Sequence, residues 1–254
     1  MMTPLKGRHA LVTGGGRGIG RAIASSLVRA GATVTVVGRS PATLEHAIMH
    51  GDAHAAAVAD VTNAQAVEAA VHDAVARYGP VDVLIANAGA AVSMPFLKSG
   101  PEVFRQMMDV NLLGVTNMAQ AVLGSMMERG FGRIVAVAST AGLKGYPYVS
   151  AYCAAKHAVV GFVRSLALET ARVGVTVNAV CPGFTDTDLV AESLEKIMAK
   201  TGRSRDEAMA ELVKHNPQGR LIQAAEVADA VLWLCGEGAR SVTGQAIAVA
   251  GGEI

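Results

Sequence analysis

The chain has 254 residues, of which 51% are hydrophobic, and it carries a formal net charge of +1. This length suffices for one α/β domain with a large core. The near-neutral charge does not indicate electrostatic binding to nucleic acid. No apolar run reaches the ~18 residues of a membrane span, and residues 1–7 lack the layout of a signal peptide. We therefore expect a soluble, cytoplasmic protein that does not associate with membranes. The three cysteines lack metal-ligand spacing, so no metal site is expected.

Short β-branched runs alternate with longer helical patterns along the chain. Strands are expected at residues 9–13, 33–37, 55–59, 81–86, 133–138, 175–180 and 245–249. Helices are expected at about 18–30, 41–50, 63–78, 101–129, 149–172 and 224–236. Nearly continuous apolar strands indicate a parallel sheet that is buried on both faces. The alternation predicts a Rossmann-like, doubly wound α/β fold of about seven strands with helices on both faces.

No linker or internal repeat divides the chain, so we expect residues 1–254 to form a single dinucleotide-binding domain. Residues 184–220 fit the alternation least, because they contain helical pieces without a strand. We expect this segment to form a helical flap over the carboxyl edge of the sheet. Ligands bind at that edge in such folds.

A glycine-rich segment joins the first expected strand to the first expected helix. Glycines permit a tight turn and a close approach of the backbone to a pyrophosphate, and the following helix offers amide donors at its N-terminus. The position between a strand and a helix favours a cofactor loop over a merely flexible one. The residues expected to bind the dinucleotide here are Gly14, Gly16, Arg17, Gly18, Ile19 and Gly20.

The end of the second expected strand indicates which dinucleotide binds. NAD-binding proteins tend to place a carboxylate there to accept hydrogen bonds from the ribose. Here the strand ends with Gly38 and Arg39, and Arg17 lies in the loop nearby. Because guanidinium groups bind phosphate oxygens well, we expect NADPH or NADP+ in preference to NADH. The alternative is that Arg39 is simply a solvated residue after a strand.

Tyr152 and Lys156 are four residues apart in an expected helix and therefore share one of its faces. A neighbouring positive charge favours the phenolate and lowers the pKa of a tyrosine. Such a tyrosine can donate and accept a proton near neutral pH. A lone pair with this spacing also occurs by chance on solvated helices, so the interpretation depends on the other motifs.

The motifs taken together resemble those of the short-chain dehydrogenase/reductase family, over essentially the whole chain. They occur in the order Thr13–Gly20, Asp60-Val61, Asn87–Ala90, Asn111, Ser139, Tyr152 with Lys156, and Pro182-Gly183. Residues 174–183 resemble the 3-oxoacyl reductase branch of that family, which includes the polyketide ketoreductases. The resemblance implies an NADP-dependent oxidoreductase that acts on a ketone or a secondary alcohol.

The resemblance also implies roles for residues that bind the cofactor. Asp60 should accept a hydrogen bond from the adenine amino group, although Asp60, Thr62 and Asn63 all suit the start of the following helix. Thr187 should bind the nicotinamide, or else cap the first flap helix. The full set implied to line the cofactor site beyond the glycine-rich loop is Asp60, Val61, Asn87, Ala88, Gly89, Tyr152, Lys156, Pro182, Gly183, Thr185 and Thr187.

For the chemistry, the resemblance implies four catalytic residues. Ser139 should donate a hydrogen bond to the ketone oxygen, and Tyr152 should deliver the proton. Lys156 should lower the pKa of Tyr152 and bind the nicotinamide ribose. Asn111 should hold a water that links Lys156 to solvent, although a hydrogen bond inside its helix is an equally simple interpretation.

The expected substrate pocket is mostly apolar. Its candidate lining is Ser139, Met94, Leu143, Tyr146, Phe184 and Leu189. This lining suits an acyl or ring ketone, and the leading hypothesis is reduction of a 3-oxoacyl thioester carried by CoA or acyl carrier protein. The alternatives are a reductase or dehydrogenase of a free ketone or secondary alcohol, and a cofactor-binding subunit without catalysis, against which the intact catalytic residues argue. The resemblance further implies a homotetramer.

Overall fold

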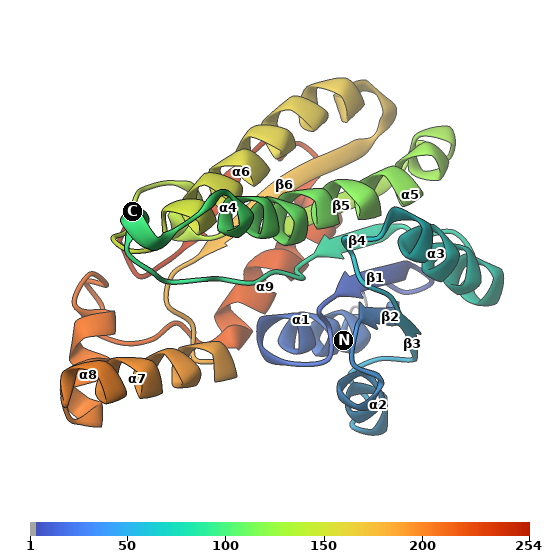
Figure 1. The fold of residues 1–254 in the computed structure, drawn as a ribbon. Coiled ribbons are helices and arrows are strands. Elements are labelled where there is room, and N and C mark those ends of the chain that lie inside the picture. The colour runs from blue at the N-terminus through green and yellow to red at the C-terminus, as the bar shows by residue number, and fades with distance from the viewer. Residues whose placement is uncertain (1–3) are drawn as a thin grey trace.

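A computed structural model describes residues 4–254, except for the side chains of residues 189, 192, 193, 196, 197 and 200 (Figure 1). Within this part of the chain, seven strands form one parallel sheet in the order β3-β2-β1-β4-β5-β6-β7. The strands are β1 (His9–Thr13), β2 (Thr33–Gly38), β3 (Ala55–Val58), β4 (Val83–Ala86), β5 (Gly132–Val137), β6 (Val175–Pro182) and β7 (Ala246–Val249). The expected doubly wound α/β fold is confirmed.

The central strands are as buried as their composition predicts, whereas the edge strands β3 and β7 are only partly buried. Every residue of β1, β4, β5 and β6 is buried. These strands consist largely of Val, Ile, Leu and Ala, and helices cover both of their faces. Burial on two faces explains why they lack the alternation of apolar and polar residues found in half-exposed strands.

Helices form a layer on each side of the sheet (Figure 1). Helices α1 (Gly18–Arg29) and α9 (Ala224–Cys235) pack against each other on one face, where α2 (Pro41–Met49) also lies. Helices α3 (Ala64–Tyr78), α5 (Gly114–Glu128) and α6 (Ser150–Thr170) cover the other face. Among the residues described, no helix has the length and apolar character needed to cross a membrane.

The single long helix expected at 101–129 is interrupted. Helix α4 (Pro101–Met108) is followed by a π-helical turn (Asp109–Leu113) before α5 begins. Asn111 lies inside this turn and is fully buried, with its side-chain amide donating to the carbonyl of Met107 at 3.0 Å. A side chain that bonds a helical carbonyl competes with the regular backbone ladder, and π-turns are frequent at functional sites.

The segment expected as a flap contains two helices, α7 (Asp188–Thr201) and α8 (Arg205–Val213), which stand apart from the sheet at the lower left of Figure 1. They pack on each other through a small apolar cluster of their own, formed by Val190, Leu194, Ala208 and Leu212. An isolated parallel bridge pairs Thr185 with Ile222 and closes the base of this segment.

Candidate active site

The segments that carry the catalytic candidates meet at the carboxyl edge of the sheet. Ser139 follows β5, residues 87–89 follow β4, and Gly183 follows β6. Because neighbouring parallel strands end at the same edge, residues far apart in sequence become neighbours there. Tyr152 and Lys156 enter this group from α6, which packs against β6 and against the short 3-10 turn after Ser139.

Lys156 lies deep in the site, with only 4% of its surface exposed. Its Nζ donates a 2.9 Å hydrogen bond to the carbonyl of Val137 and lies 5.7 Å from the centre of the Tyr152 ring. Burial of the ammonium lowers the pKa of Lys156 to about 8. The lysine is therefore close to its titration point at physiological pH.

The pKa of Tyr152 is shifted in the opposite direction from the one expected from the sequence. Burial raises the pKa of its phenol above the ordinary value, and a hydrogen bond with Ser139 acts in the opposite direction. The expectation that Lys156 lowers this pKa is wrong here, because the lysine ammonium bonds to the Val137 carbonyl while the phenol is removed from water. In this state Tyr152 is a protonated hydroxyl, which is the form that a proton donor requires.

Ser139 is held in a defined orientation beside the phenol. Its backbone is extended, and its Oγ accepts a 3.1 Å hydrogen bond from the amide of Ala141 at the start of the 3-10 turn. A hydroxyl that accepts one hydrogen bond still has its own proton to donate. Ser139 can therefore donate to an oxygen placed between it and Tyr152.

Asn111 ties the loop after β4 to the end of helix α4. Its Nδ2 donates to the carbonyl of Ala90 at 2.9 Å, and its Oδ1 accepts from the amide of Ala90 at 3.3 Å. A Cβ atom at Gly89 would lie 2.7 Å from Asn111 Oδ1 and 3.5 Å from Lys156 Nζ, so only glycine fits there. The structure thus shows the internal hydrogen bonds considered for Asn111; the water relay implied by the resemblance stays a prediction.

The glycine-rich loop has the form needed to hold a pyrophosphate. Gly14 has a φ of +64°, and a Cβ atom there would lie 2.8 Å from Asn87 Nδ2. Gly20 approaches more closely still, since an added Cβ would overlap both the Gly14 carbonyl and the Asn87 side chain. The first turn of α1 has neither a side-chain cap nor an acidic residue, so its amide donors suit an anion.

The remaining loop residues surround the start of α1. Gly16 lies against Thr43, Gly18 lies against Thr187, and Ile19 packs on the core beneath α1. Arg17 precedes the helix in an extended conformation, with its side chain exposed. The loop therefore combines a backbone cradle with an exposed guanidinium, which fits an anionic dinucleotide.

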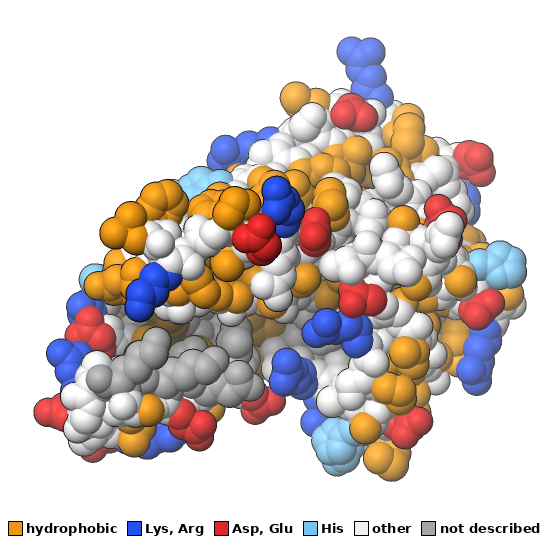
Figure 2. Space-filling model, in the orientation of Figure 1, with side chains coloured by type: hydrophobic (Ala, Val, Ile, Leu, Met, Phe, Trp, Pro, Cys, Tyr) orange, Lys and Arg blue, Asp and Glu red, His pale blue; other side chains and the backbone are white. Residues whose placement is uncertain are grey.

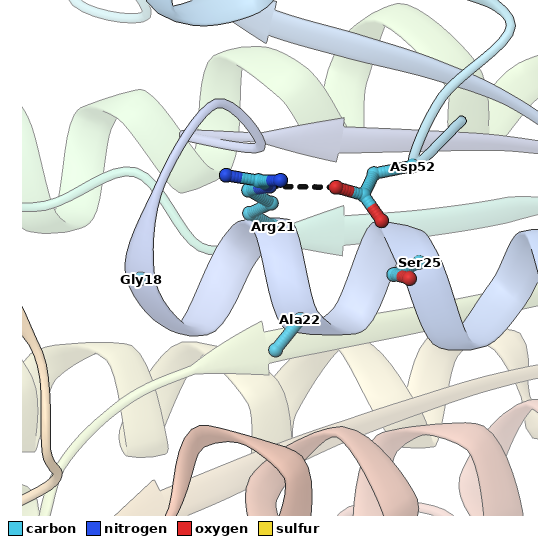
Figure 3. Close-up of a pocket in the computed structure, with 5 residues that line it drawn as sticks. All are labelled: Gly18, Arg21, Ala22, Ser25 and Asp52. Atoms are coloured by element: carbon cyan, nitrogen blue, oxygen red, sulfur yellow. Dashed lines mark hydrogen bonds and ion pairs between the residues drawn. The ribbon is translucent and has the colours of Figure 1, made fainter. Parts of the chain in front are cut away.

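Three arginines lie near this end of the sheet, and their surroundings differ. A surface pocket lined by α1 and Asp52 contains Arg21, whose Nε donates to Asp52 Oδ2 at 2.6 Å (Figure 3). Arg21 also donates to His46 Nδ1 at 3.1 Å, so its guanidinium is held by protein partners. The side chain of Arg39 is 77% exposed and lies 3.8 Å from Asp60. Arg17 and Arg39 are thus the arginines better placed to reach a phosphate.

Asp60 does not cap the helix that follows it. The N-cap of α3 is Asn63, whose side chain accepts from the Ala66 amide at 3.0 Å. Asp60 Oδ1 instead accepts from the amide and the hydroxyl of Thr62, at 3.0 and 2.8 Å, and these bonds lower the pKa of its carboxyl group. Val61 is buried against Gly114, and its carbonyl accepts from Asn117 at 2.8 Å.

The nicotinamide candidates form a compact loop after β6. Pro182 ends the strand, and Thr185 is buried, with its hydroxyl donating to the Gly183 carbonyl at 3.0 Å. Thr187 precedes α7 but does not cap it with its side chain, because its hydroxyl donates to the Thr185 carbonyl at 3.2 Å. The capping alternative for Thr187 is therefore not what the structure shows.

Most of the expected substrate wall gathers in loops beside this edge. Met94, Leu143, Tyr146 and Phe184 are all half-buried, and the rings of Tyr146 and Phe184 meet edge to face with centroids 6.2 Å apart. The side chain of Leu189 lies outside the described part of the structure. Hydrophobic side chains also gather over the loop before α4 at the upper left of Figure 2, where Phe96 and Leu97 are 67% and 97% exposed.

Comparison with known proteins identifies the family. The family model described as short chain dehydrogenase matches residues 8–198. The 3-oxoacyl-(acyl-carrier-protein) reductase FabG of Haemophilus influenzae is 37% identical to the chain over 249 residues, with 98% of each sequence covered. The chain belongs to the short chain dehydrogenase family. It is therefore an oxidoreductase.

Solved structures of the family agree with the architecture. A structure of actinorhodin polyketide ketoreductase with NADPH is 41% identical, with a TM-score of 0.92 over 100% of this chain and 99% of that one. A structure of levodione reductase is 34% identical, with a TM-score of 0.92 over 98% of both chains. The similar enzymes thus include a 3-oxoacyl-(acyl-carrier-protein) reductase, a polyketide ketoreductase and a levodione reductase.

Thr13, the first residue of the glycine-rich motif, has a role in this short chain dehydrogenase that the motif itself does not assign. The Thr13 hydroxyl accepts from the backbone amides of Asn87 and Ala88, both at 2.9 Å, while Asn87 Nδ2 donates to the Thr13 carbonyl at 2.9 Å. Thr13 therefore joins the glycine-rich loop to the loop after β4. A polar residue that ends an otherwise apolar strand was the available signal.

Proposed function

We propose that this protein reduces a 3-oxoacyl thioester, carried by CoA or acyl carrier protein, to the 3-hydroxyacyl thioester with NADPH. The observation that carries the proposal is the meeting of Ser139, Tyr152 and Lys156 at the carboxyl edge of β5, beside the glycine-rich loop. The similarity to the FabG reductase and to a polyketide ketoreductase supports the 3-oxoacyl class of substrate.

The glycine-rich loop and the N-terminus of α1 would hold the pyrophosphate, and Arg17 and Arg39 would bind the 2′-phosphate. Thr185, Thr187 and Gly183 would lie beside the nicotinamide. When bound, the cofactor supplies a hydride to the ketone carbon. The remaining requirements of the reaction fall on the residues of the chain.

Ser139 would donate a hydrogen bond to the ketone oxygen and stabilise the negative charge that develops on it. Tyr152 would then transfer its hydroxyl proton to that oxygen. Lys156, with its pKa near 8, would supply a positive charge next to the tyrosinate that remains and would help its reprotonation. The net change is a ketone, a hydride and a proton converted to a secondary alcohol.

A second candidate is reduction of a free ketone, which is supported by the similarity to levodione reductase and by the apolar half-buried wall. The experiment that separates the two follows NADPH absorbance with acetoacetyl-CoA and with a bulky aryl ketone, each repeated with NADH. Turnover of the thioester with NADPH is expected. Turnover of the aryl ketone alone would favour the second candidate, and a preference for NADH would contradict the assignment of Arg17 and Arg39.

A further inference from the structure

The carboxyl-terminal tail, residues 250–254, turns back toward the active site after β7. Gly251 and Gly252 have φ values of +62° and +91°, and the amide of Glu253 donates to the Ala250 carbonyl at 3.2 Å. A side chain at Gly251 would overlap Asn216, which lies where the flap segment returns to the sheet. The tail is therefore folded tightly against the base of the flap.

The carboxylate of Glu253 is buried at the end of this turn, with 2% of its side chain exposed. Its Oε1 lies 3.0 Å from Lys144 Nζ and 2.7 Å from the Tyr146 hydroxyl, which in turn lies 2.7 Å from Thr140 Oγ1. A phenol has one proton, so Tyr146 donates to the carboxylate and accepts from Thr140. Burial, with the neighbouring carboxylate, raises the pKa of Tyr146 and keeps this donor protonated.

These contacts join two loops that serve the reaction. Thr140 directly follows Ser139, so one end of the hydrogen-bonded chain is fixed beside the residue that faces the ketone oxygen. On the other side, a Cβ atom at Gly183 would lie 3.3 Å from Glu253 Oε2, and the Gly183 amide donates to the Val249 carbonyl at 3.0 Å. Glu253 thus lies between the loop after β5 and the loop after β6.

Burying the carboxylate of Glu253 costs desolvation free energy, which partners in good geometry must offset. Here all the described partners come from residues 140–146, the segment that also supplies Leu143 and Tyr146 to the pocket wall. Two loops that are free to shift by an ångström would misalign a ketone between its hydride donor and its proton donor.

We propose that Glu253 is a positioning residue, which through Tyr146 and Lys144 holds residues 139–148 against residues 183–187 and thereby fixes the face of the ketone that is reduced. The inference rests on the proposed function for its catalytic consequence. The positioning itself is a property of the tail and the two loops, and can be measured without a substrate.

The decisive comparison is between Glu253→Ala and Ile254→Ala, since Ile254 shares the tail but is 53% exposed. With whichever ketone the wild type reduces, Glu253→Ala should lower kcat/KM about 10- to 100-fold. It should also lower the enantiomeric excess of the alcohol and raise the deuterium isotope effect with C4-deuterated NADPH. Its Kd for NADPH should change less than its kcat/KM, because the glycine-rich loop that would hold the pyrophosphate is untouched.

Two further variants separate the contacts of Glu253. Glu253→Gln keeps an acceptor for Tyr146 but removes the charge that pairs with Lys144, so it should retain more enantiomeric excess than Glu253→Ala. Tyr146→Phe and Glu253→Ala break the same hydrogen bond, so the double variant should lose little beyond the worse single variant.

A purely structural tail would lower the melting temperature of Glu253→Ala while leaving enantiomeric excess and isotope effect unchanged, and that result would overturn the proposal. Hydrogen–deuterium exchange of the proteins without ligand tests the positioning of the loops independently of any substrate. Exchange in residues 139–148 should accelerate in Glu253→Ala but not in Ile254→Ala. Unchanged exchange would overturn the proposal, whereas a wild type that reduces no ketone would overturn only the proposed function.

Discussion

Lys156 Nζ lies 5.7 Å from the centre of the Tyr152 ring, yet it donates its hydrogen bond to the carbonyl of Val137, 2.9 Å away. The two side chains share a helix face, as their spacing predicts. The lysine ammonium nevertheless lies over the ring, and its hydrogen bond goes to a backbone carbonyl and not to the phenol. Both groups are shifted toward their neutral forms by burial, since the pKa of Tyr152 is raised and that of Lys156 is lowered to about 8.

Replacing the proton donor should abolish most turnover. Tyr152→Phe should lower kcat by about 10²–10⁴-fold, because it removes the general acid and leaves the cofactor loop intact. Initial rates and NADPH binding, measured together, check this. Tyr78→Phe, at a tyrosine on α3, should retain wild-type turnover. Undiminished kcat in Tyr152→Phe would contradict the mechanism.

Removing the buried ammonium should make the protein more stable at neutral pH. Below about pH 8 the folded protein bears the full cost of burying the Lys156 charge; between about 8 and 10.5 it binds fewer protons than the unfolded chain, so the free energy of unfolding rises with pH. Lys156→Met should therefore gain about 2 kcal/mol at pH 7, after about 1 kcal/mol for the lost bond to Val137.

The advantage of Lys156→Met should shrink to near zero as the pH approaches 10.5, where the lysine is neutral in the folded protein and only about half charged in the unfolded chain. Urea unfolding of the wild type and of Lys156→Met at pH 7 and pH 10 measures this difference in the free energy of unfolding. Lys6→Met, at an exposed lysine, should show no such pH-dependent difference. Equal stability of Lys156→Met and wild type at both pH values would mean that burial of this ammonium carries no cost.

Cofactor preference should depend on the exposed arginines. Arg39→Ala and Arg17→Ala should each raise the KM for NADPH about 10- to 100-fold and leave the KM for NADH nearly unchanged, because each loses a charge-assisted bond to the 2′-phosphate. Steady-state kinetics with both cofactors test this. Arg29→Ala, at the far end of α1, should behave as wild type, since its guanidinium donates to Ser25. If the KM rose equally for NADPH and NADH, the two arginines would not bind the 2′-phosphate.

Two helical glycines should respond in opposite directions to alanine. Gly20→Ala should destabilise the protein and weaken NADPH binding, because its Cβ would overlap the Gly14 carbonyl. Gly124→Ala, in the interior of α5 with nothing near its Cβ position, should stabilise the fold by about 0.5–1 kcal/mol. Denaturant unfolding and NADPH titration give both answers. If Gly20→Ala changed neither the free energy of unfolding nor the binding of NADPH, the close contact between Gly20 and Gly14 would be needed for neither.

The expected homotetramer can be tested on α6. Leu168 on this helix is 83% exposed, so it is available to contact a partner chain if α6 lies at the interface, as the resemblance implies. Light scattering of the wild type should give the mass of four chains, and Leu168→Glu should give a smaller species. Met49→Glu, at a 75% exposed position on α2, should leave the mass unchanged. A monomeric wild type would refute the assembly.

The sequence alone determined the fold class, and it predicted which residues form the candidate site. Apolar runs separated by helical patterns are local features of the sequence. The glycine-rich loop and the Tyr152–Lys156 spacing are local as well. Each can therefore be recognised from the sequence without knowledge of the tertiary structure. The π-turn at Asn111 could not be predicted, because the hydrogen bonds of its side chain to Ala90 exist only when the loop after β4 is in place.

The tertiary structure alone decided the electrostatics of the site and the position of the chain's end. Whether a neighbouring charge or desolvation controls the pKa of Tyr152 depends on burial, which the spacing of two residues does not specify. Glu253 is separated from Tyr146 by 107 positions, and only the turn after β7 brings its carboxylate to the phenol. Long-range contacts of this kind arise from the packing of the whole sheet and leave no pattern in the local sequence.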